Sequence, residues 1–260
     1  MNSRADQLKA LDRLLTIMDE LREQCPWDRK QTFQSLRHLT IEELYELADA
    51  LLEEDLEEIK KELGDLLLHI FFYSKIGSEK KAFDIADVAN QMAEKLIYRH
   101  PHIYGDVQAD DAEAVKKNWE ALKLKEGKTS VFEGVPKGLP AVVKALRLQE
   151  KAAGVGFDWR EAAPVWEKIK EELSEFETEY QAMQLQAMEN EFGDLLFSMV
   201  NFARLTGIDP ESALERTNKK FISRFKHMEK LAQKQGHKVS DLDLPTLESF
   251  WQKAKTIVDS

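Results

Sequence analysis

Two stretches of the chain carry the same set of carboxylates at the same internal spacing. Each contains Glu-Glu-x-x-Glu and, further along, Glu-x-Gly-Asp-Leu-Leu, and the two copies are offset by 129 positions throughout. An acidic pattern repeated in the same order is typical of a duplicated structural unit, and it favours metal binding over an ordinary charged surface. The ten candidate metal ligands are Glu42, Glu43, Glu46, Glu62 and Asp65 in the first copy and Glu171, Glu172, Glu175, Glu191 and Asp194 in the second.

The spacing of these carboxylates predicts that they converge between two packed helices. Residues three or four positions apart share one face of a helix. Two like charges about 4 Å apart cost roughly 4 kcal/mol at an effective dielectric constant near 20, so a cluster of carboxylates needs a cation. All the candidate ligands are oxygens, which favours Mg²⁺, with Mn²⁺ as a substitute, over zinc. A single copy would be interpreted as a solvated helix face, but here apolar residues flank both aspartates.

A glycine stands within the second acidic motif of each copy, at Gly64 and Gly193. Glycine destabilises a helix by about 1 kcal/mol relative to alanine. We therefore expect another helix to pack closely beside each site.

Cationic residues later in the second copy could bind a polyanion. Lys220 and Arg224 are one helical turn apart and could grip one phosphate group, and Asn218 precedes them. Trp251 and Lys255 could add an aromatic wall and an ammonium, although Trp251 is equally well explained as a core anchor. Carboxylate ligands beside such cations suggest a phosphoryl substrate bridged by a divalent metal. The first copy matches at Lys95, Arg99, Trp119 and Lys123.

The elements that position these residues are predicted to be helices, because apolar residues recur at three- and four-residue steps and no alternating strand pattern appears. We expect the second helix to begin after an N-cap at Thr40 and the third to end at Gly77. The fold class is therefore all-α, with two tandem duplicated helical-bundle domains. The predicted segments are an N-terminal domain at 1–126, a linker with a short helix at 127–160, and a C-terminal domain at 161–260. The predicted helices include 113–125, 163–185 and 188–206.

Composition limits the classes of function. The net charge of −11 argues against a general nucleic-acid binder but not against a nucleotide bound through metal ions. One cysteine, Cys25, excludes an intrachain disulfide and fits a reducing compartment. The longest apolar run is too short to span a bilayer. We expect a cytoplasmic protein with neither a nucleic-acid nor a membrane partner.

Four motifs together resemble the MazG family of nucleoside triphosphate pyrophosphohydrolases, which belongs to the all-α NTP pyrophosphatase class. The resemblance extends over about residues 5–258. The acidic pattern alone would leave open related members that hydrolyse dUTP or dCTP. The other three motifs are Cys25-Pro26-Trp27-Asp28 followed by Gln31-Thr32, Arg99-His100-Pro101-His102, and Gly154-Val155-Gly156-Phe157-Asp158-Trp159.

The resemblance implies Mg²⁺-dependent hydrolysis of nucleoside triphosphates to monophosphate and pyrophosphate, broad in base, for nucleotide-pool housekeeping or regulation. It also implies that the C-terminal copy carries most of the catalysis. In support, the N-terminal copy has Glu94 where the C-terminal copy has Lys219. The resemblance assigns catalysis to Glu172, Glu175, Lys220 and Arg224, and substrate binding to Asn218, Lys220, Arg224, Trp251 and Lys255.

The sequence also bears on the oligomeric state and leaves two alternative functions. Wide apolar helix faces and the resemblance both predict a homodimer. A non-catalytic nucleotide sensor or scaffold that retains the acidic site is the main alternative. A ferritin-like di-iron bundle would use Glu-x-x-His. Here the pattern is Glu-x-x-Asp, and His69 has Ser198 as its equivalent, so the imidazole is not duplicated.

Overall fold

The computed structural model describes residues 2–105 and 130–258, and the chain forms two compact units, Met1–Val115 and Lys116–Ser260. Across the described residues the secondary structure is helical, with no β-strand, which confirms the predicted all-α class. The segment limits at 126 and 160 stay predictions. The predicted helix at 113–125, with Trp119 and Lys123, lies outside the described residues.

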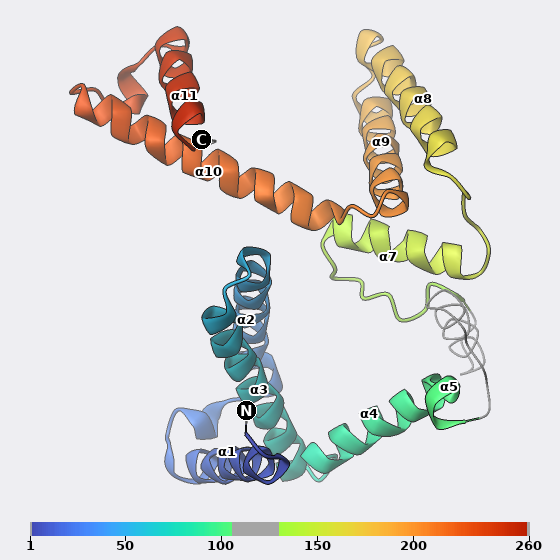
Figure 1. Cartoon of the computed structure of the whole chain (residues 1–260), viewed down its shortest axis with the longest axis vertical. Helices are drawn as coiled ribbons and strands as arrows, with labels where there is room; N and C mark the ends of the chain where they lie inside the picture. Colours follow the sequence, from blue (N-terminus) through green and yellow to red (C-terminus); the bar gives the residue numbers. More distant parts are fainter. Residues whose placement is uncertain (1, 106–129, 259–260) are drawn as a thin grey trace. The chain divides into compact units, whose positions relative to one another are not determined.

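The helices of each unit follow the chain in order (Figure 1). In the first unit they are α1 Arg4–Gln24, η1 Asp28–Lys30, α2 Phe33–Glu53, α3 Leu56–Glu79, α4 Ile85–Arg99 and α5 Pro101–Tyr104. In the second they are α7 Ala141–Gly154, α8 Ala162–Gln181, α9 Leu185–Leu205, α10 Pro210–Lys234, η2 Val239–Asp241 and α11 Leu244–Val258.

The start of α2 corrects the predicted N-cap. The helix begins at Phe33, and Thr32 forms a capping box with Ser35, in which each side chain bonds the other residue's backbone N–H. This cap satisfies two amides that the first turn would otherwise leave unpaired. Thr40 therefore lies inside the helix, where its hydroxyl donates to the carbonyl of Leu36 at 3.1 Å.

The end of α3 corrects the second boundary. The helix continues past Gly77 to Glu79. A Cβ on Gly77 would lie 2.7 Å from the ring of Phe83 and 2.8 Å from its carbonyl oxygen. The glycine thus permits close approach of the segment that leads into α4, rather than ending the helix.

The first unit packs α1, α2 and α3 together. Its buried cluster joins Met18 of α1, Leu36 of α2, and Phe72 and Ile76 of α3. An ion pair between Arg22 and Glu79, 2.5 Å apart, ties the end of α1 to the end of α3. This core fixes the α2–α3 hairpin, which carries the first acidic motif.

The second unit contains two helical hairpins. Helices α8 and α9 pack along each other and carry the second acidic motif, and α7 packs on α9, where the Gln149 amide donates to the carbonyl of Phe197 at 2.8 Å. Helices α10 and α11 form the other hairpin around Met228, Ala232, Phe250 and Ala254. The turn between α8 and α9 lies at 182–184, so the predicted end of α8 at 185 and the predicted start of α9 at 188 were four and three residues late.

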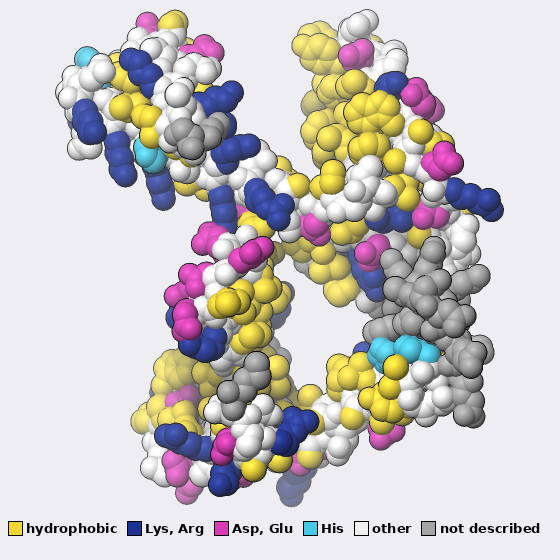
Figure 2. Space-filling model, viewed as in Figure 1, with side chains coloured by type: hydrophobic (Ala, Val, Ile, Leu, Met, Phe, Trp, Pro, Cys, Tyr) yellow, Lys and Arg dark blue, Asp and Glu magenta, His cyan; other side chains and the backbone are white. Residues whose placement is uncertain are grey.

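Large apolar side chains remain exposed on the α8–α9 hairpin (Figure 2). They include Trp166, Leu173, Phe192, Leu196 and Phe197, each at least 43% exposed. Across the described ranges, no helix combines the length and the low charge needed to cross a bilayer.

Candidate metal centres

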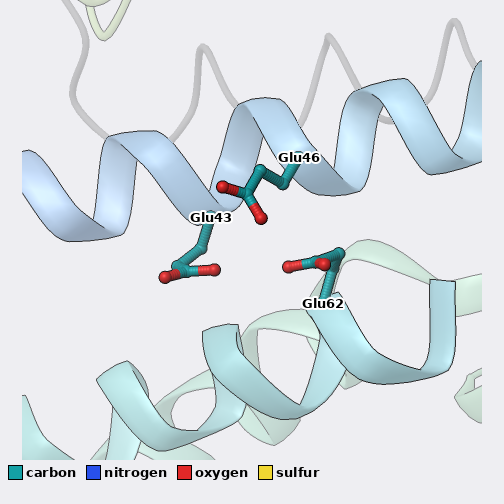
Figure 3. A group of neighbouring side chains, drawn as sticks. All are labelled: Glu43, Glu46 and Glu62. Atoms are coloured by element: carbon teal, nitrogen blue, oxygen red, sulfur yellow. The ribbon is translucent and has the colours of Figure 1, made fainter. Parts of the chain in front are cut away.

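The α2–α3 hairpin brings three carboxylates together. Glu43 and Glu46 project from α2 toward Glu62 on α3 (Figure 3). One oxygen from each lies within 4.8 Å of the others. Glu62 is only 2% exposed, whereas Glu46 is open to solvent. Ligands from two helices therefore face one point that solvent can reach from one side.

The α8–α9 hairpin repeats this arrangement with the equivalent residues. Glu172 and Glu175 come from α8 and Glu191 from α9, and one oxygen from each again lies within 4.8 Å of the others. Glu172 is 6% exposed, and Glu175 is open to solvent. The 129-residue repeat in the sequence thus corresponds to a repeated group of carboxylates.

Glu62 has a buried oxygen that lacks a partner. Its Oε1 accepts a hydrogen bond from the Lys61 ammonium at 2.8 Å. Its Oε2 is buried and has no hydrogen-bond partner among the described residues. A buried carboxylate oxygen left unsatisfied is destabilising, because burial removes its water without replacing it. A cation between the helices would satisfy this oxygen.

Crowding of the carboxylates also changes their acidity. Burial, followed by the charges of Asp65, Glu46 and Glu62, raises the pKa of Glu43. Loss of water, followed by the charge of Glu172, raises the pKa of Glu175, while Lys168 opposes the shift. In each hairpin one carboxylate therefore holds its proton more tightly than an ordinary glutamate. A divalent cation would reverse that preference.

Lys168 is a cation of the second hairpin that the sequence reasoning missed. Its ammonium lies 2.8 Å from an oxygen of Glu171 and 2.8 Å from one of Glu172. The hydrogen bonds that the Lys168 ammonium donates to Glu171 and Glu172 raise the pKa of Lys168 well above its usual range. The signal was present, since Lys168 precedes these acids by three and four residues on one helix. The equivalent position in the first copy is Leu39.

Four predicted ligands lie outside the three-carboxylate groups, namely Glu42, Asp65, Glu171 and Asp194. Asp65 is half-buried, and its charge acts on Glu43. Glu171 pairs with Lys168. Glu42 and Asp194 are exposed. A role for these four as ligands stays a prediction.

The prediction of close packing beside the two glycines is wrong for the described chain. A Cβ at Gly64 or Gly193 would meet no atom within 4 Å. Both residues are exposed, because they lie on the side of α3 and α9 that faces away from the partner helix of the hairpin. The outer face of each hairpin around these glycines is therefore open.

The predicted phosphate-binding residues lie on the α10–α11 hairpin. Asn218 and Lys220 are exposed on α10, Arg224 is half-buried one turn further along, and Lys255 is exposed on α11. Trp251 is half-buried and packs against Phe221, with ring centroids 5.0 Å apart. Carboxylates and cations of the second copy are thus carried by separate hairpins.

The donor set fits a hard divalent cation. Each three-carboxylate group offers only oxygen, and oxygen donors with one solvent-facing side suit Mg²⁺, which retains several waters. Glu43, Glu46 and Glu62 would hold the ion in the first hairpin, and Glu172, Glu175 and Glu191 in the second.

Comparison with known proteins identifies the repeat. A sequence model of the MazG nucleotide pyrophosphohydrolase domain matches residues 31–104 and 162–229, so each match contains one acidic hairpin. The nucleoside triphosphate pyrophosphohydrolase of Escherichia coli (strain K12) is 38% identical over 257 residues, covering 95% of this chain and 98% of that protein.

Two further relatives agree. The nucleoside triphosphate pyrophosphohydrolase/pyrophosphatase MazG of Thermotoga maritima is 44% identical over 249 residues, covering 94% of this chain and 95% of that protein. The uncharacterised protein YabN of Bacillus subtilis is 44% identical over 246 residues, which make up 92% of this chain and 50% of YabN. The tandem match confirms the predicted duplication, and the chain belongs to the MazG family of nucleotide pyrophosphohydrolases.

Proposed function

We propose that the protein hydrolyses nucleoside triphosphates to nucleoside monophosphate and pyrophosphate in the presence of Mg²⁺. The observation that carries the proposal is the convergence of three carboxylates in each acidic hairpin. Family membership supports the same reaction, because relatives that match nearly the full chain are named for it. We expect broad tolerance of the base and a role in maintaining the nucleotide pool.

Residues of the second copy would have separate roles in the reaction. A Mg²⁺ ion bound there would neutralise phosphate charge and lower the pKa of water. Glu172 and Glu175 would orient a water molecule for in-line attack on the α-phosphorus and accept its proton. The bond from the α-phosphorus to the bridging oxygen would break, and pyrophosphate would leave. Lys220 and Arg224 would stabilise charge on the phosphates, and Asn218, Trp251 and Lys255 would position the nucleotide.

We propose the C-terminal copy as the main working site because its charges suit a triphosphate better. Helix α10 carries seven basic and three acidic residues, whereas the corresponding helix α4 carries two of each. Figure 2 shows Lys and Arg side chains along α10. The substitution of Lys219 by Glu94 in the first copy contributes to this difference.

The direct test measures the products from a panel of nucleoside triphosphates with Mg²⁺. We expect equal amounts of monophosphate and pyrophosphate, and no turnover when the metal is chelated. Release of inorganic phosphate with a nucleoside diphosphate would contradict the proposed position of cleavage. Binding of triphosphates without turnover would instead support a nucleotide sensor.

We also propose that the protein is a homodimer in the cytoplasm. Exposed apolar side chains on α8–α9 and the open surface beside Gly193 support a second copy packing there. Charge supports it as well, because α8–α9 has nine acidic against three basic residues, and α10–α11 has ten basic against six acidic. The α10–α11 hairpin of one copy could thus bring Lys220 and Arg224 to the carboxylates of the other.

Sedimentation at micromolar concentration tests the proposed dimer. The measured mass should be twice the chain mass of 30.0 kDa, and a monomer would contradict the proposal.

A further inference from the structure

A polar network adjoins the carboxylates of the first hairpin. The Thr40 hydroxyl oxygen lies 3.1 Å from the carbonyl oxygen of Leu36, 2.6 Å from the hydroxyl of Tyr73 and 3.0 Å from Nδ1 of His69. A carbonyl only accepts, so the single hydroxyl hydrogen of Thr40 goes to Leu36. Tyr73 and His69 must then donate to Thr40. The hydrogen of the His69 ring is therefore fixed on Nδ1.

The other ring nitrogen of His69, Nε2, is left as an electron-pair donor. His69 is 7% exposed, and burial lowers its pKa, with the Asp65 charge acting in the opposite direction. No hydrogen bond to Nε2 occurs within the described part of the chain. Histidines that bind metals through one nitrogen are commonly oriented by a hydrogen bond from the other.

The ring lies along the same seam as the acidic group. His69 follows Asp65 by one turn of α3, and helical side chains lean toward the N-terminus of their helix, which places the ring over the Asp65 turn. The charge of Asp65 acts on both Glu43 and His69. Thr40, which contacts His69 Nδ1, precedes Glu43 by one turn of α2, so the imidazole lies one turn along the α2–α3 seam from the three-carboxylate group, which itself contains the buried, unpartnered Oε2 of Glu62.

The second hairpin lacks this network. At the positions of Thr40, His69 and Tyr73 it has Ile169, Ser198 and Phe202. Of these three, only serine is polar, and none offers a nitrogen ligand. Because the two hairpins repeat the same carboxylates, the imidazole is a difference in donor type between two otherwise equivalent groups.

We propose that the first hairpin is a mixed nitrogen–oxygen metal site, in which His69 Nε2 and Asp65 join the group of Glu43, Glu46 and Glu62 and the imidazole selects a transition-series divalent ion over Mg²⁺. Imidazole favours such ions, whereas carboxylate oxygens alone suit Mg²⁺. His69 and Asp65 lie outside the three-carboxylate group, so binding would draw both side chains toward the ion. The inference rests on the metal sites of the proposed function, and it assigns the two copies different metals.

The test uses the full chain with the second hairpin disabled by Glu172→Gln and Glu175→Gln. Mn²⁺ is titrated in, and pulsed electron paramagnetic resonance detects coupling between the ion and a nitrogen nucleus. We expect nitrogen coupling in this background and its loss in His69→Ser, which copies Ser198, while Mn²⁺ still binds. We also expect the preference for Mn²⁺ over Mg²⁺ to fall at least about tenfold in His69→Ser, or about 1.4 kcal/mol.

Two controls separate the possible failures. Circular dichroism checks that the His69 variant folds, and Thr40→Val, which keeps the shape but loses the hydrogen bond to Nδ1, should weaken the coupling. Bound Mn²⁺ without nitrogen coupling, or coupling that survives His69→Ser, overturns the inference and leaves the proposed hydrolase intact. No Mn²⁺ bound in the Glu172→Gln, Glu175→Gln background overturns the inference together with the first metal site.

Discussion

In the α2–α3 hairpin the lysine nearest the carboxylates is Lys61, directly before Glu62, whereas in α8–α9 it is Lys168, on the opposite helix of the pair. Lys61 also pairs with Glu58, away from the acidic group, while Lys168 pairs with two predicted ligands. The two copies therefore share their carboxylate positions and differ in the cations around them.

The same contrast extends to the helix expected to meet the phosphates. Helix α4 carries equal numbers of acidic and basic residues, and α10 carries an excess of basic ones. Ligand spacing depends on two helices packed in one register, so a duplicated fold preserves it. Surface charges do not affect that packing and can change freely. The two copies thus share the arrangement of their carboxylates but differ in the charge of the helix expected to meet the phosphates.

The largest expected effect comes from removing the carboxylates of one hairpin at a time. Glu172→Gln with Glu175→Gln should lower pyrophosphate release at least about 100-fold, a loss of about 2.7 kcal/mol in barrier reduction. Each amide keeps the size of the side chain but removes the charge that holds a metal. The matched pair Glu43→Gln with Glu46→Gln should cost far less. A greater loss in the N-terminal pair would reverse our assignment of the working site.

Replacing the predicted phosphate-binding cations should have a smaller effect. Lys220→Ala or Arg224→Ala should lower kcat/KM at least about tenfold, or about 1.4 kcal/mol, while Mg²⁺ binding is kept. Lys95→Ala, on α4, is the control and should change kcat/KM by less than about twofold, or about 0.4 kcal/mol. Steady-state assays at saturating Mg²⁺ measure all three. If Lys220→Ala and Lys95→Ala lowered kcat/KM equally, the result would indicate that both copies bind substrate.

Charge reversal in the first copy should give a modest gain. In the Glu172→Gln, Glu175→Gln background, Glu94→Lys should raise the residual pyrophosphate release about threefold, or about 0.6 kcal/mol, because it restores the cation found at Lys219. The comparison is with the same background carrying Glu94→Gln. If neither substitution increases the residual rate of pyrophosphate release, the charge on α4 does not explain the expected difference in activity between the two copies.

The pKa shifts predict a weak pH dependence that distinguishes metal-bound from metal-free protein. The pKa of Glu43 and that of Glu175 are raised above 4.5, the ordinary pKa of a glutamate. At pH values just above 4.5 the folded protein therefore binds more protons at these two residues than the unfolded chain does. In metal-free protein this contribution to stability is complete below the unfolded pKa and is lost as pH rises through the folded pKa. Metal binding needs the deprotonated form, so its affinity falls as pH decreases through the same window.

Thermal unfolding with and without Mg²⁺ across this range measures both trends. The stabilisation by Mg²⁺ should decrease before the pH reaches the range of an ordinary glutamate. A constant increment through that range would show that the two shifted carboxylates do not bind the ion.

Helical periodicity predicted the fold well because apolar spacing records which face of a helix is buried. Boundaries failed where tertiary contacts decide them. Thr40 resembles an N-cap in sequence, but Thr32 and Ser35 cap the helix a full two turns earlier. Gly77 resembles a helix stop, but it accommodates Phe83.

The candidate site was predictable to the extent that spacing determines it. Steps of three and four residues predicted that Glu43 and Glu46 on one helix would face Glu62 on the next. The same steps predicted the equivalent group of Glu172, Glu175 and Glu191. The contacts of Lys168 depend on side-chain conformation, and those of His69 and Thr40 depend on the register between two helices. The spacing of Lys168 from Glu171 and Glu172 carried a signal for its ion pairs, whereas nothing within one motif encodes the register that brings His69 to Thr40.

Counting bound ions tests the central claim, that each acidic hairpin is a metal site, most directly. Mn²⁺ titration followed by electron paramagnetic resonance, without nucleotide, should be performed on the wild type, on Glu43→Gln with Glu46→Gln, and on Glu172→Gln with Glu175→Gln. Each double variant should lose only the ions of its own hairpin and keep those of the other. Equal numbers of bound ions in all three proteins would contradict it.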